Sequence, residues 1–472
     1  MSKTMSGLTM VLSCMMVATW SSDVLATPYA SGIQLNGTSS TFILNQDAAS
    51  VDVVYDGGAV VVSLGALAKG SHTFDATLGT TWEIVCTGST PAGWTQISDD
   101  SLTQSKYYSP RGVTVDANPM RSTFGRIFVS EGFGGAVSSG GRTTTDGLYI
   151  MTADQGDVTG QGDAAYAGAV DWTIGGSHSP MKVSLNRNDA AGQDYTVYIG
   201  DWSDPHSGIW TADATNPSAA FNELLDNTGR DGDGLVLTGT FTPAELHGSV
   251  PCGPWVEGTG ASRTMYTVDE DVRLGNVLQY DIGATTSGYN TAPTDRTTDG
   301  PDIILNGRAD VVRDEDGSWW IAQYRYDDSD SVPSLSHWAD GASAPSWTSG
   351  QSTMRLNLAY GSIDIFDELD LLVMGTQDDK IYILDISDPA NPVLVDVIPN
   401  PGERTHDVSF DAAGNVYAVN SSSETLRIYS PGGDWMATTG SDGTFTLVKV
   451  PEPTTLGVLA LGGLVALRRR RA

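Results

Sequence analysis

A recurring unit of short strands and tight turns constrains the fold of most of this chain of 472 residues. The clearest copy runs from Thr405 to Gly433, where β-branched and aromatic runs alternate with turns such as Ala412–Asn415. A single unit of this kind cannot bury both of its faces, so neighbouring units must stack. Repetition of such units is typical of a β-propeller, which we expect at residues 107–449.

Further copies of the unit fix the expected number of blades. They begin, in chain order, at Arg111, Met181, Met265, Ala309 and Ile363. Together with the copy at Thr405 they predict six blades, and seven is the nearest alternative. Residues 443–448 form another short apolar run, which we expect to supply the outer strand of the last blade.

The first part of the body carries a different strand pattern. Residues 31–90 contain β-branched and aromatic runs of strand length, and Asp56-Gly57-Gly58 is a tight-turn signal between two of them. This density predicts a small β-sandwich within residues 27–106, which include a linker. The 54 glycines and the low charged fraction of 17% also fit an all-β, turn-rich secreted protein.

Three segments of the body resemble known families. Residues 42–74 resemble the Ig-like domain of flagellar hook-capping proteins, which implies an Ig-like sandwich. Residues 380–394, with an Asp-Pro-x-x-Pro turn, resemble the LVIVD repeat of secreted bacterial propellers. His406 to Tyr429 resembles an NHL or gluconolactonase-type blade. These resemblances imply a propeller rather than an activity, because propellers host unrelated functions.

The first 26 residues have the pattern of a secretory signal peptide. Lys3 precedes an apolar run from Met5 to Trp20, and Val24-Leu25-Ala26 offers small or modest side chains at the −3 and −1 positions. We therefore expect export through the Sec translocon and cleavage between Ala26 and Thr27. Cys14 lies inside the apolar run, and lipoprotein processing at that cysteine is the alternative.

The C-terminal residues 450–472 form a three-part pattern. A Pro-Glu-Pro triplet is followed by the apolar run Leu456–Leu467 and then by four arginines. A helix from Thr454 to Leu467 would span roughly 21 Å, which is short of the hydrocarbon core of about 30 Å. Arginine-rich flanks stay on the cytoplasmic side, so this segment is expected to hold the chain in the membrane before processing.

This tail closely resembles the PEP-CTERM sorting signal of exopolysaccharide-producing Gram-negative bacteria. The resemblance implies recognition by exosortase, a membrane protease-transpeptidase, and a final place in the cell envelope, on the cell surface or in the extracellular matrix. An ordinary C-terminal membrane anchor is the alternative. The residues that carry the signal are Pro451, Glu452, Pro453, Arg468, Arg469, Arg470 and Arg471.

The net charge of −32 limits the partners of the body. Removal of Lys3, Asp23 and the four terminal arginines leaves 20 basic and 56 acidic residues, a charge near −36. A chain this acidic repels nucleic acid and attracts cations. Calcium is the candidate cation and no other cofactor is expected. Alternating oxygen ligands and glycine place its candidate ligands at Asp226, Asp231 and Asp233, although a solvated acidic turn is the competing interpretation.

No catalytic constellation stands out in the sequence. It has no Gly-x-Ser-x-Gly elbow and no His-Glu-x-x-His helix, so we expect no catalytic residue. The leading hypothesis is a non-catalytic binding module for polysaccharide or another surface partner, with blade tryptophans as candidate sugar contacts. A metal-dependent gluconolactonase-type hydrolase or lyase is the first alternative, with Asp116, Asn186 and Asp411 near strand ends. A purely structural matrix protein is the second.

Two further features of the sequence stay open. Asp314, Glu315 and Asp316 form one additional acidic cluster, and residues 327–330 form another. Cys86 and Cys252 are the cysteines of the mature body, and we expect two separate buried thiols, with an interdomain disulfide as the alternative.

Overall fold

The computed structural model describes residues 27–450 except 92, 159–161, 204–205, 226–252, 269–276, 290, 292, 298–309, 324–332, 351–355, 357 and 403. The described part is all-β, as predicted, apart from short 3-10 turns. These turns are η1 (Gly37–Ser39), η2 (Thr103–Ser105), η3 (Trp172–His178), η5 (Gly260–Ser262) and η6 (Asp367–Leu369). Within this described part, no helix is both long and apolar enough to cross a membrane.

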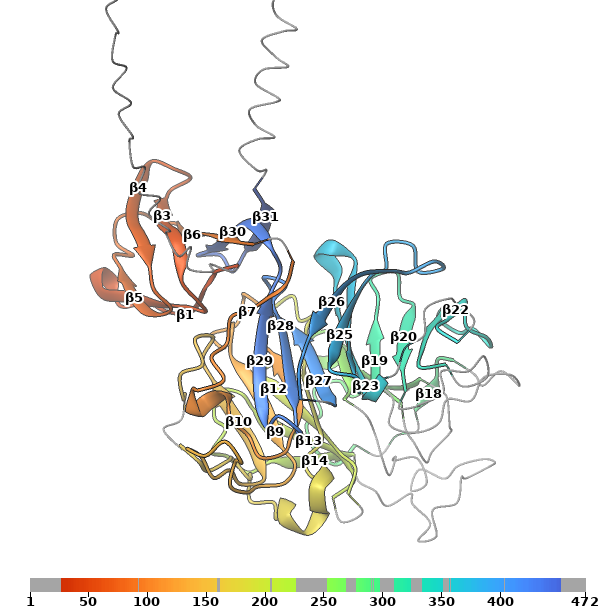
Figure 1. Cartoon of the computed structure of the whole chain (residues 1–472). Helices are drawn as coiled ribbons and strands as arrows, with labels where there is room; N and C mark the ends of the chain where they lie inside the picture. Colours follow the sequence, from red (N-terminus) through yellow and green to blue (C-terminus); the bar gives the residue numbers. More distant parts are fainter. Residues whose placement is uncertain are drawn as a thin grey trace, which may run out of the picture.

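Six antiparallel sheets of the described residues form the blades of a propeller, which agrees with the predicted count. The first blade has three strands and each of the others has four (Figure 1). In chain order the strands are β8 (Pro110–Val115), β9 (Ile127–Glu131) and β10 (Gly147–Met151); β11 (Lys182–Leu185), β12 (Thr196–Asp201), β13 (Gly208–Asp213) and β14 (Asn222–Leu225); β15 (Trp255–Glu257), β16 (Thr264–Thr267), β17 (Leu278–Tyr280) and β18 (Thr294–Asp295); β19 (Asp310–Arg313), β20 (Trp319–Ala322), β21 (Leu335–Trp338) and β22 (Trp347–Thr348); β23 (Leu358–Phe366), β24 (Leu371–Thr376), β25 (Lys380–Asp385) and β26 (Val393–Pro399); and β27 (Thr405–Phe410), β28 (Val416–Asn420), β29 (Thr425–Ser430) and β7 (Thr95–Gln96).

The innermost strands of the six blades form a closed ring. Each contacts the innermost strand of the next blade, and β27 of the last blade contacts β8 of the first. Buried carboxylates on these strands bind the next strand along the ring: Asp364 accepts from the backbone N–H of Phe410 at 2.7 Å, and Asp407 accepts from that of Val113 at 2.8 Å. Such bonds satisfy both the carboxylate and the buried backbone group.

The last blade takes its outermost strand from the N-terminal side of the propeller. Gln96 of β7 pairs with Tyr429 of β29, which closes the ring with a strand that precedes all of the blades in the sequence. The prediction that residues 443–448 supply this outer strand is wrong. The strand there, β31 (Phe445–Lys449), pairs instead with β30 (Gly433–Gly440), because β30 joins the sheet of the N-terminal domain.

That domain is a sandwich built from both ends of the body. One sheet has the order β1-β2-β5 and the other has the order β31-β30-β6-β3-β4 (Figure 1). The two sheets enclose one core that includes Phe42, Val53, Ile84 and Cys86. The N-terminal strands are β1 (Ala30–Gln34), β2 (Ser40–Leu44), β3 (Ala48–Tyr55), β4 (Val60–Leu67), β5 (Gly70–Phe74) and β6 (Trp82–Thr90). Whether this sandwich is Ig-like stays a prediction.

An aromatic cluster joins the sandwich to the propeller. The ring of Tyr29 lies 5.4 Å from the ring of Phe124 and 5.9 Å from that of Phe445, measured between centroids. Phe124 lies in the β8–β9 loop, and Ala412 and Ala413 of the β27–β28 loop belong to the same buried cluster. Loops that join first to second strands lie at one end of antiparallel blades, so the sandwich contacts this face of the propeller at its first and last blades.

Candidate functional site

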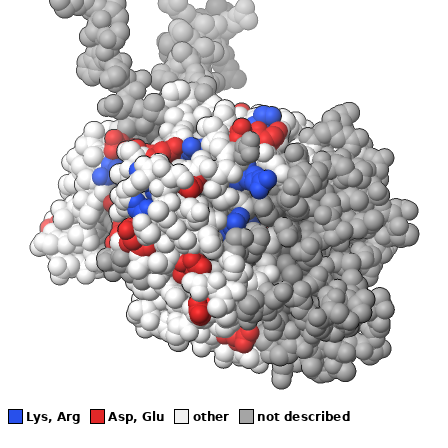
Figure 2. All heavy atoms as spheres, turned by 60° about the horizontal axis from the view of Figure 1, so that its bottom comes forward, with Lys and Arg blue, Asp and Glu red and all other residues white. Residues whose placement is uncertain are grey.

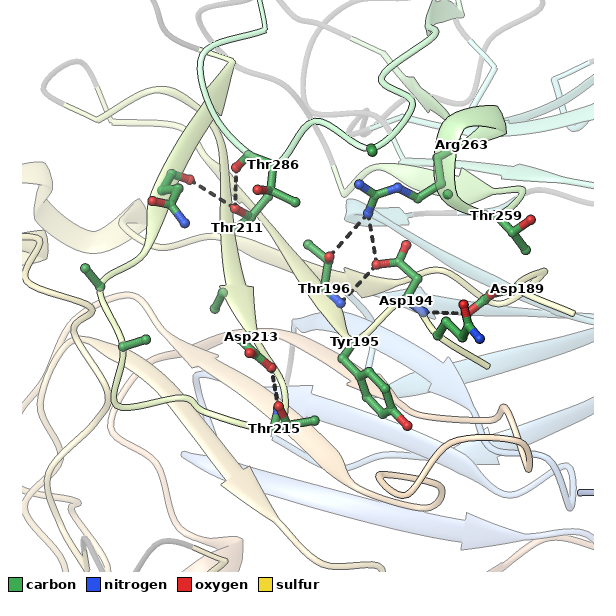
Figure 3. Close-up of a pocket in the computed structure, with 17 residues that line it drawn as sticks. Asp189, Asp194, Tyr195, Thr196, Thr211, Asp213, Thr215, Thr259, Arg263 and Thr286 are labelled. Carbon is green, nitrogen blue, oxygen red and sulfur yellow. Dashed lines mark hydrogen bonds and ion pairs between the residues drawn. The ribbon is translucent and has the colours of Figure 1, made fainter. Parts of the chain in front are cut away.

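A cleft of about 620 Å³ lies between the second and third blades of the described part of the chain. Its walls come from loops that join the first strand to the second and the third strand to the fourth in each blade. These loops share the propeller face that carries the sandwich. Figure 3 shows the lining side chains of Asp189, Asp194, Thr196, Thr211 and Thr286 gathered around the opening.

Local hydrogen bonds set the shape of the cleft. Asp194 accepts from the backbone N–H of Thr196 at 3.2 Å, and Asp213 accepts from both the backbone N–H and the hydroxyl of Thr215 at 2.7 Å. An Asp that binds the residue two positions later holds a turn, so these Asp-x-Thr segments form the rim. Internal hydrogen bonds also orient threonine hydroxyls of the lining: that of Thr211 donates to the carbonyl of Thr286 at 2.7 Å.

The buried side chain of Arg263 links the two blades that form the cleft. The Nη1 of Arg263 donates to the carboxylate of Asp194 at 2.9 Å and to the hydroxyl of Tyr198 at 2.9 Å, and its Nε donates to the carbonyl of Gly283 at 2.7 Å. Burial alone would raise the pKa of Asp194, but the hydrogen bond with Thr196 and the charge of Arg263 outweigh it and lower this pKa. The Asp194 carboxylate is therefore ionised and engaged at neutral pH.

The chemistry of the lining is that of a polar binding surface. Hydroxyl groups of threonine predominate, Gln193 and Asn222 add side-chain amides, and Tyr195 adds one aromatic ring. Hydroxyls and amides both donate and accept hydrogen bonds, so they match a ligand rich in hydroxyl groups. Among the described residues, the lining contains neither histidine nor cysteine.

Lys182 of β11 and Arg187, two residues after the end of that strand, fill the central channel, where a volume of only about 50 Å³ remains. The Nζ of Lys182 lies 2.5 Å from the carboxylate of Asp407 and 3.4 Å from that of Asp310. Arg187 forms an ion pair with Asp364 and donates to the hydroxyl of Ser409 at 3.0 Å. The channel thus joins opposite blades through ion pairs.

Burial has a strong effect on the carboxyl groups near the channel. It raises the pKa of Asp407 against the opposing charge of Lys182. It also raises the pKa of Glu131, at the end of β9, to about 8, although Ser109 donates a backbone hydrogen bond to it. The shift at Asp407 comes from packing at the centre of the ring, whereas Glu131 is buried at the end of the second strand of the first blade, and neither shift by itself defines a site.

The residues of the lactonase alternative form structural hydrogen bonds within turns or between neighbouring blades. Asp116 accepts from Arg121 at 3.1 Å, Asn186 donates to the carbonyl of Gly258 at 2.8 Å, and Asp411 accepts from the backbone N–H of Asn415 at 2.9 Å. Among the described residues, no group of three or more His, Cys, Asp or Glu side chains is arranged to hold a metal ion.

The calcium candidates Asp226, Asp231 and Asp233 lie outside the described residues, as do the acidic cluster at 327–330 and Cys252. In the other acidic cluster, Asp316 accepts from the backbone N–H of Ser318 at 2.8 Å, as expected for a turn.

Most blade tryptophans serve as core rather than as sugar contacts. Trp319, Trp320 and Trp338 are fully buried, because their large rings fill the space between neighbouring sheets. Trp210 and Trp347 are partly buried and pack against the same kind of cluster. Tyr195 is instead the aromatic side chain of the cleft.

The structure describes some of the residues named in the predictions for the two termini and the cysteines. Thr27, the predicted first residue of the mature chain, is buried, and its backbone nitrogen donates to the hydroxyl of Ser430 at 3.0 Å. Ala26, the apolar run of the tail and its arginines lie outside the described residues. Cys86 is a buried free thiol in the core of the sandwich.

Sequence reasoning missed the residues that build the cleft. The repeated Asp-x-Thr spacing at Asp194 and Asp213 is a visible turn signal, yet it does not show that two loops from different blades meet. No sequence pattern marks Arg263 as part of the cleft, because its partners are distant in the sequence. They are the carboxylate of Asp194 in another blade and the carbonyl of Gly283 in a neighbouring loop.

Comparison with known proteins identifies the tail. The chain is an all-β propeller protein, and its residues 449–471 match the PEP-CTERM protein-sorting motif. This motif marks proteins that are exported to the cell envelope or surface of Gram-negative-type bacteria and processed by exosortase, which confirms the sequence prediction. No curated protein matches the sequence of this chain.

Solved structures with related architecture have low sequence identity to the chain. A structural genomics protein of unknown function from Bacteroides thetaiotaomicron is 9% identical with a TM-score of 0.40, and the match covers 85% of this chain and 98% of that one. The WD40 β-propeller domain of Doa1 is 11% identical with a TM-score of 0.39, over 72% and 97% of the chains. A gluconolactonase from Xanthomonas campestris is 10% identical with a TM-score of 0.40, over 73% and 89%.

Proposed function

We propose that this exported propeller is a non-catalytic binding module that takes a segment of uncharged polysaccharide in the cleft between its second and third blades. The observation that carries the proposal is the lining of that cleft, where threonine hydroxyls and two amides surround a volume of about 620 Å³. A volume of this size is typical of small-molecule and oligosaccharide sites. Polar groups held by fixed turns bind with less loss of conformational entropy.

The charge of the protein favours an uncharged or cationic ligand. Asp189, Asp194 and Asp213 line the cleft, while its single basic residue, Arg263, is already paired with Asp194. On the described part of the face in Figure 2, acidic side chains lie dispersed among uncharged ones and a few Lys and Arg. An anionic polymer would be repelled by the net charge of −32, whereas a neutral one would not.

Calorimetric titration of the body, residues 27–450, with neutral polysaccharide tests the proposal. Ala220 is an exposed residue of the lining, so Ala220→Trp fills the cleft without removing an existing contact. Binding should weaken by about tenfold or more when a side chain of this size blocks the site. The matched control is Ala390→Trp, at an exposed turn after β25, which should bind as the wild type does. Equal binding by all three proteins, or hydrolysis of lactones by the body, would contradict the proposal.

Calcium is the small partner that we propose for the acidic body. The proposal rests on net charge and on the Asp/Gly spacing of residues 226–234. It is independent of the cleft.

A further inference from the structure

The sorting motif begins inside the folded sandwich. The motif covers residues 449–471, and Lys449 is the last residue of β31, paired with Trp435 of β30. The backbone nitrogen of Val450 donates to the carbonyl of Asp434 at 2.8 Å, which extends the pairing by one more residue. The residue that follows is Pro451, so no spacer separates the sheet from the Pro-Glu-Pro triplet.

The strand that leads into the triplet is joined to the sandwich along its length. β31 pairs with β30 over five residue pairs, from Trp435 with Lys449 to Thr439 with Phe445, and β30 pairs with β6 over eight. At the start of β31, four residues before Lys449, the partly buried ring of Phe445 lies 5.6 Å from that of Phe124 in the interdomain cluster. Release of the whole strand would break both the backbone pairing and this aromatic contact, which favours recognition of the tail while β31 is still paired.

The short reach of the chain then brings the processing enzyme to the sandwich. Two residues of fully extended chain span at most about 7 Å, which is the greatest distance from Val450 to Glu452. An enzyme that binds the triplet must therefore approach the end of the sheet at which β31 ends, β30 begins and β6 ends. Lys449 lies at that end with its Nζ 5.5 Å above the ring of Trp435, beside the partly exposed Asp434.

We propose that this end of the sandwich, formed by the end of β6, Gly433–Trp435 and Lys449, is a docking surface for the membrane-bound processing enzyme exosortase. The sandwich is thereby separated from the triplet by no intervening residues after Val450. So short a connection raises the effective concentration of the triplet at the enzyme once the surface is docked. Exosortase is the expected partner of this surface, because the last strand of the sandwich ends directly before the triplet that the enzyme recognises.

Insertion of six Gly and Ser residues between Val450 and Pro451 of the full-length chain tests the proposal. Docking and cleavage then lose their fixed relation, so pulse-chase conversion of precursor to processed protein should slow by about threefold or more. The same insertion between Gly57 and Gly58, in an exposed turn where a Cβ would meet nothing within 4 Å, should leave the rate unchanged. Conversion at the wild-type rate or faster after the insertion at Val450 would overturn the proposal.

A charge reversal separates docking from tether length. Asp434→Lys leaves the spacing to Pro451 intact and changes only the proposed surface, so conversion should slow while the melting temperature of the isolated body stays within about 2 °C. If both Asp434→Lys and the insertion are processed like the wild type, the sandwich makes no contact with the enzyme. Polysaccharide binding is not involved in either measurement, so failure here leaves the proposed function of the cleft untouched.

Discussion

Gln96 pairs with Tyr429, although the first belongs to the linker after the sandwich and the second to the last blade. Conversely, Ala437, which follows the last blade in the sequence, pairs with Cys86 in the sheet of the sandwich. Each domain therefore completes its sheet with a strand from the other end of the body. We infer that the two domains fold and unfold as one cooperative unit, because neither contains all of its own strands.

Removal of β30 and β31 should expose the core of the sandwich. Cys86 is fully buried and burial raises its pKa to about 12, so the intact body should not react with thiol reagents. A body that ends at Pro431 should label rapidly at Cys86 under native conditions, as measured by mass spectrometry. Both proteins should carry Cys252→Ser so that only one thiol is counted. Equal protection of Cys86 in the two proteins would show that the borrowed strands are dispensable.

Loss of the channel lysine should be strongly destabilising. Lys182→Met leaves Asp310 and Asp407 buried without their cation, which should lower the free energy of unfolding by about 3–5 kcal/mol in urea titrations. Addition of Asp407→Asn to that variant should restore part of the loss. The control is Lys380→Met, which removes an exposed ion pair with Asp378 and should cost at most about 1 kcal/mol. Equal effects at Lys182 and Lys380 would contradict the assigned role of the channel.

The sequence predicted the blades well because their signal is local. Strand-length apolar runs such as Val416–Asn420 and intervening turns repeat along the chain, and every blade except the last forms from consecutive strands. The sheet that β31 joins is determined instead by contacts between residues far apart in the sequence. Residues 443–448 fit the pattern of an outer blade strand equally well, and long-range contacts distinguish the two pairings: β30 pairs with β6, and Phe445 packs against Tyr29 and Phe124. The cleft likewise arises from loops of two blades.

Glu131 should make stability fall as the pH rises. Its pKa of about 8 in the folded protein lies above the ordinary value of 4.5, so between these values the folded state binds more protons than the unfolded state. The free energy of unfolding should therefore decrease by on the order of 1 kcal/mol per pH unit from this group between about pH 5 and pH 8. Glu131→Gln should flatten that dependence in denaturant titrations at pH 6 and pH 8. Parallel curves for the two proteins would contradict the shift.

Calcium should stabilise the body if the acidic loop binds it. A ligand that binds only the folded state raises the melting temperature, so millimolar calcium should do so in differential scanning calorimetry. Asp231→Asn removes one candidate ligand and should reduce the increase. An unchanged melting temperature in calcium, or an identical increase in the variant, would remove these aspartates from consideration.

Hydrogen exchange of the body with and without neutral polysaccharide tests the central claim most directly. Exchange should be slower in the loops that line the cleft, above all in residues 189–196, 211–222 and 259–263. Ligand contact and ordering protect backbone amides in such loops. Protection confined to other parts of the propeller, or no protection at saturating polysaccharide, would contradict a binding role for the cleft.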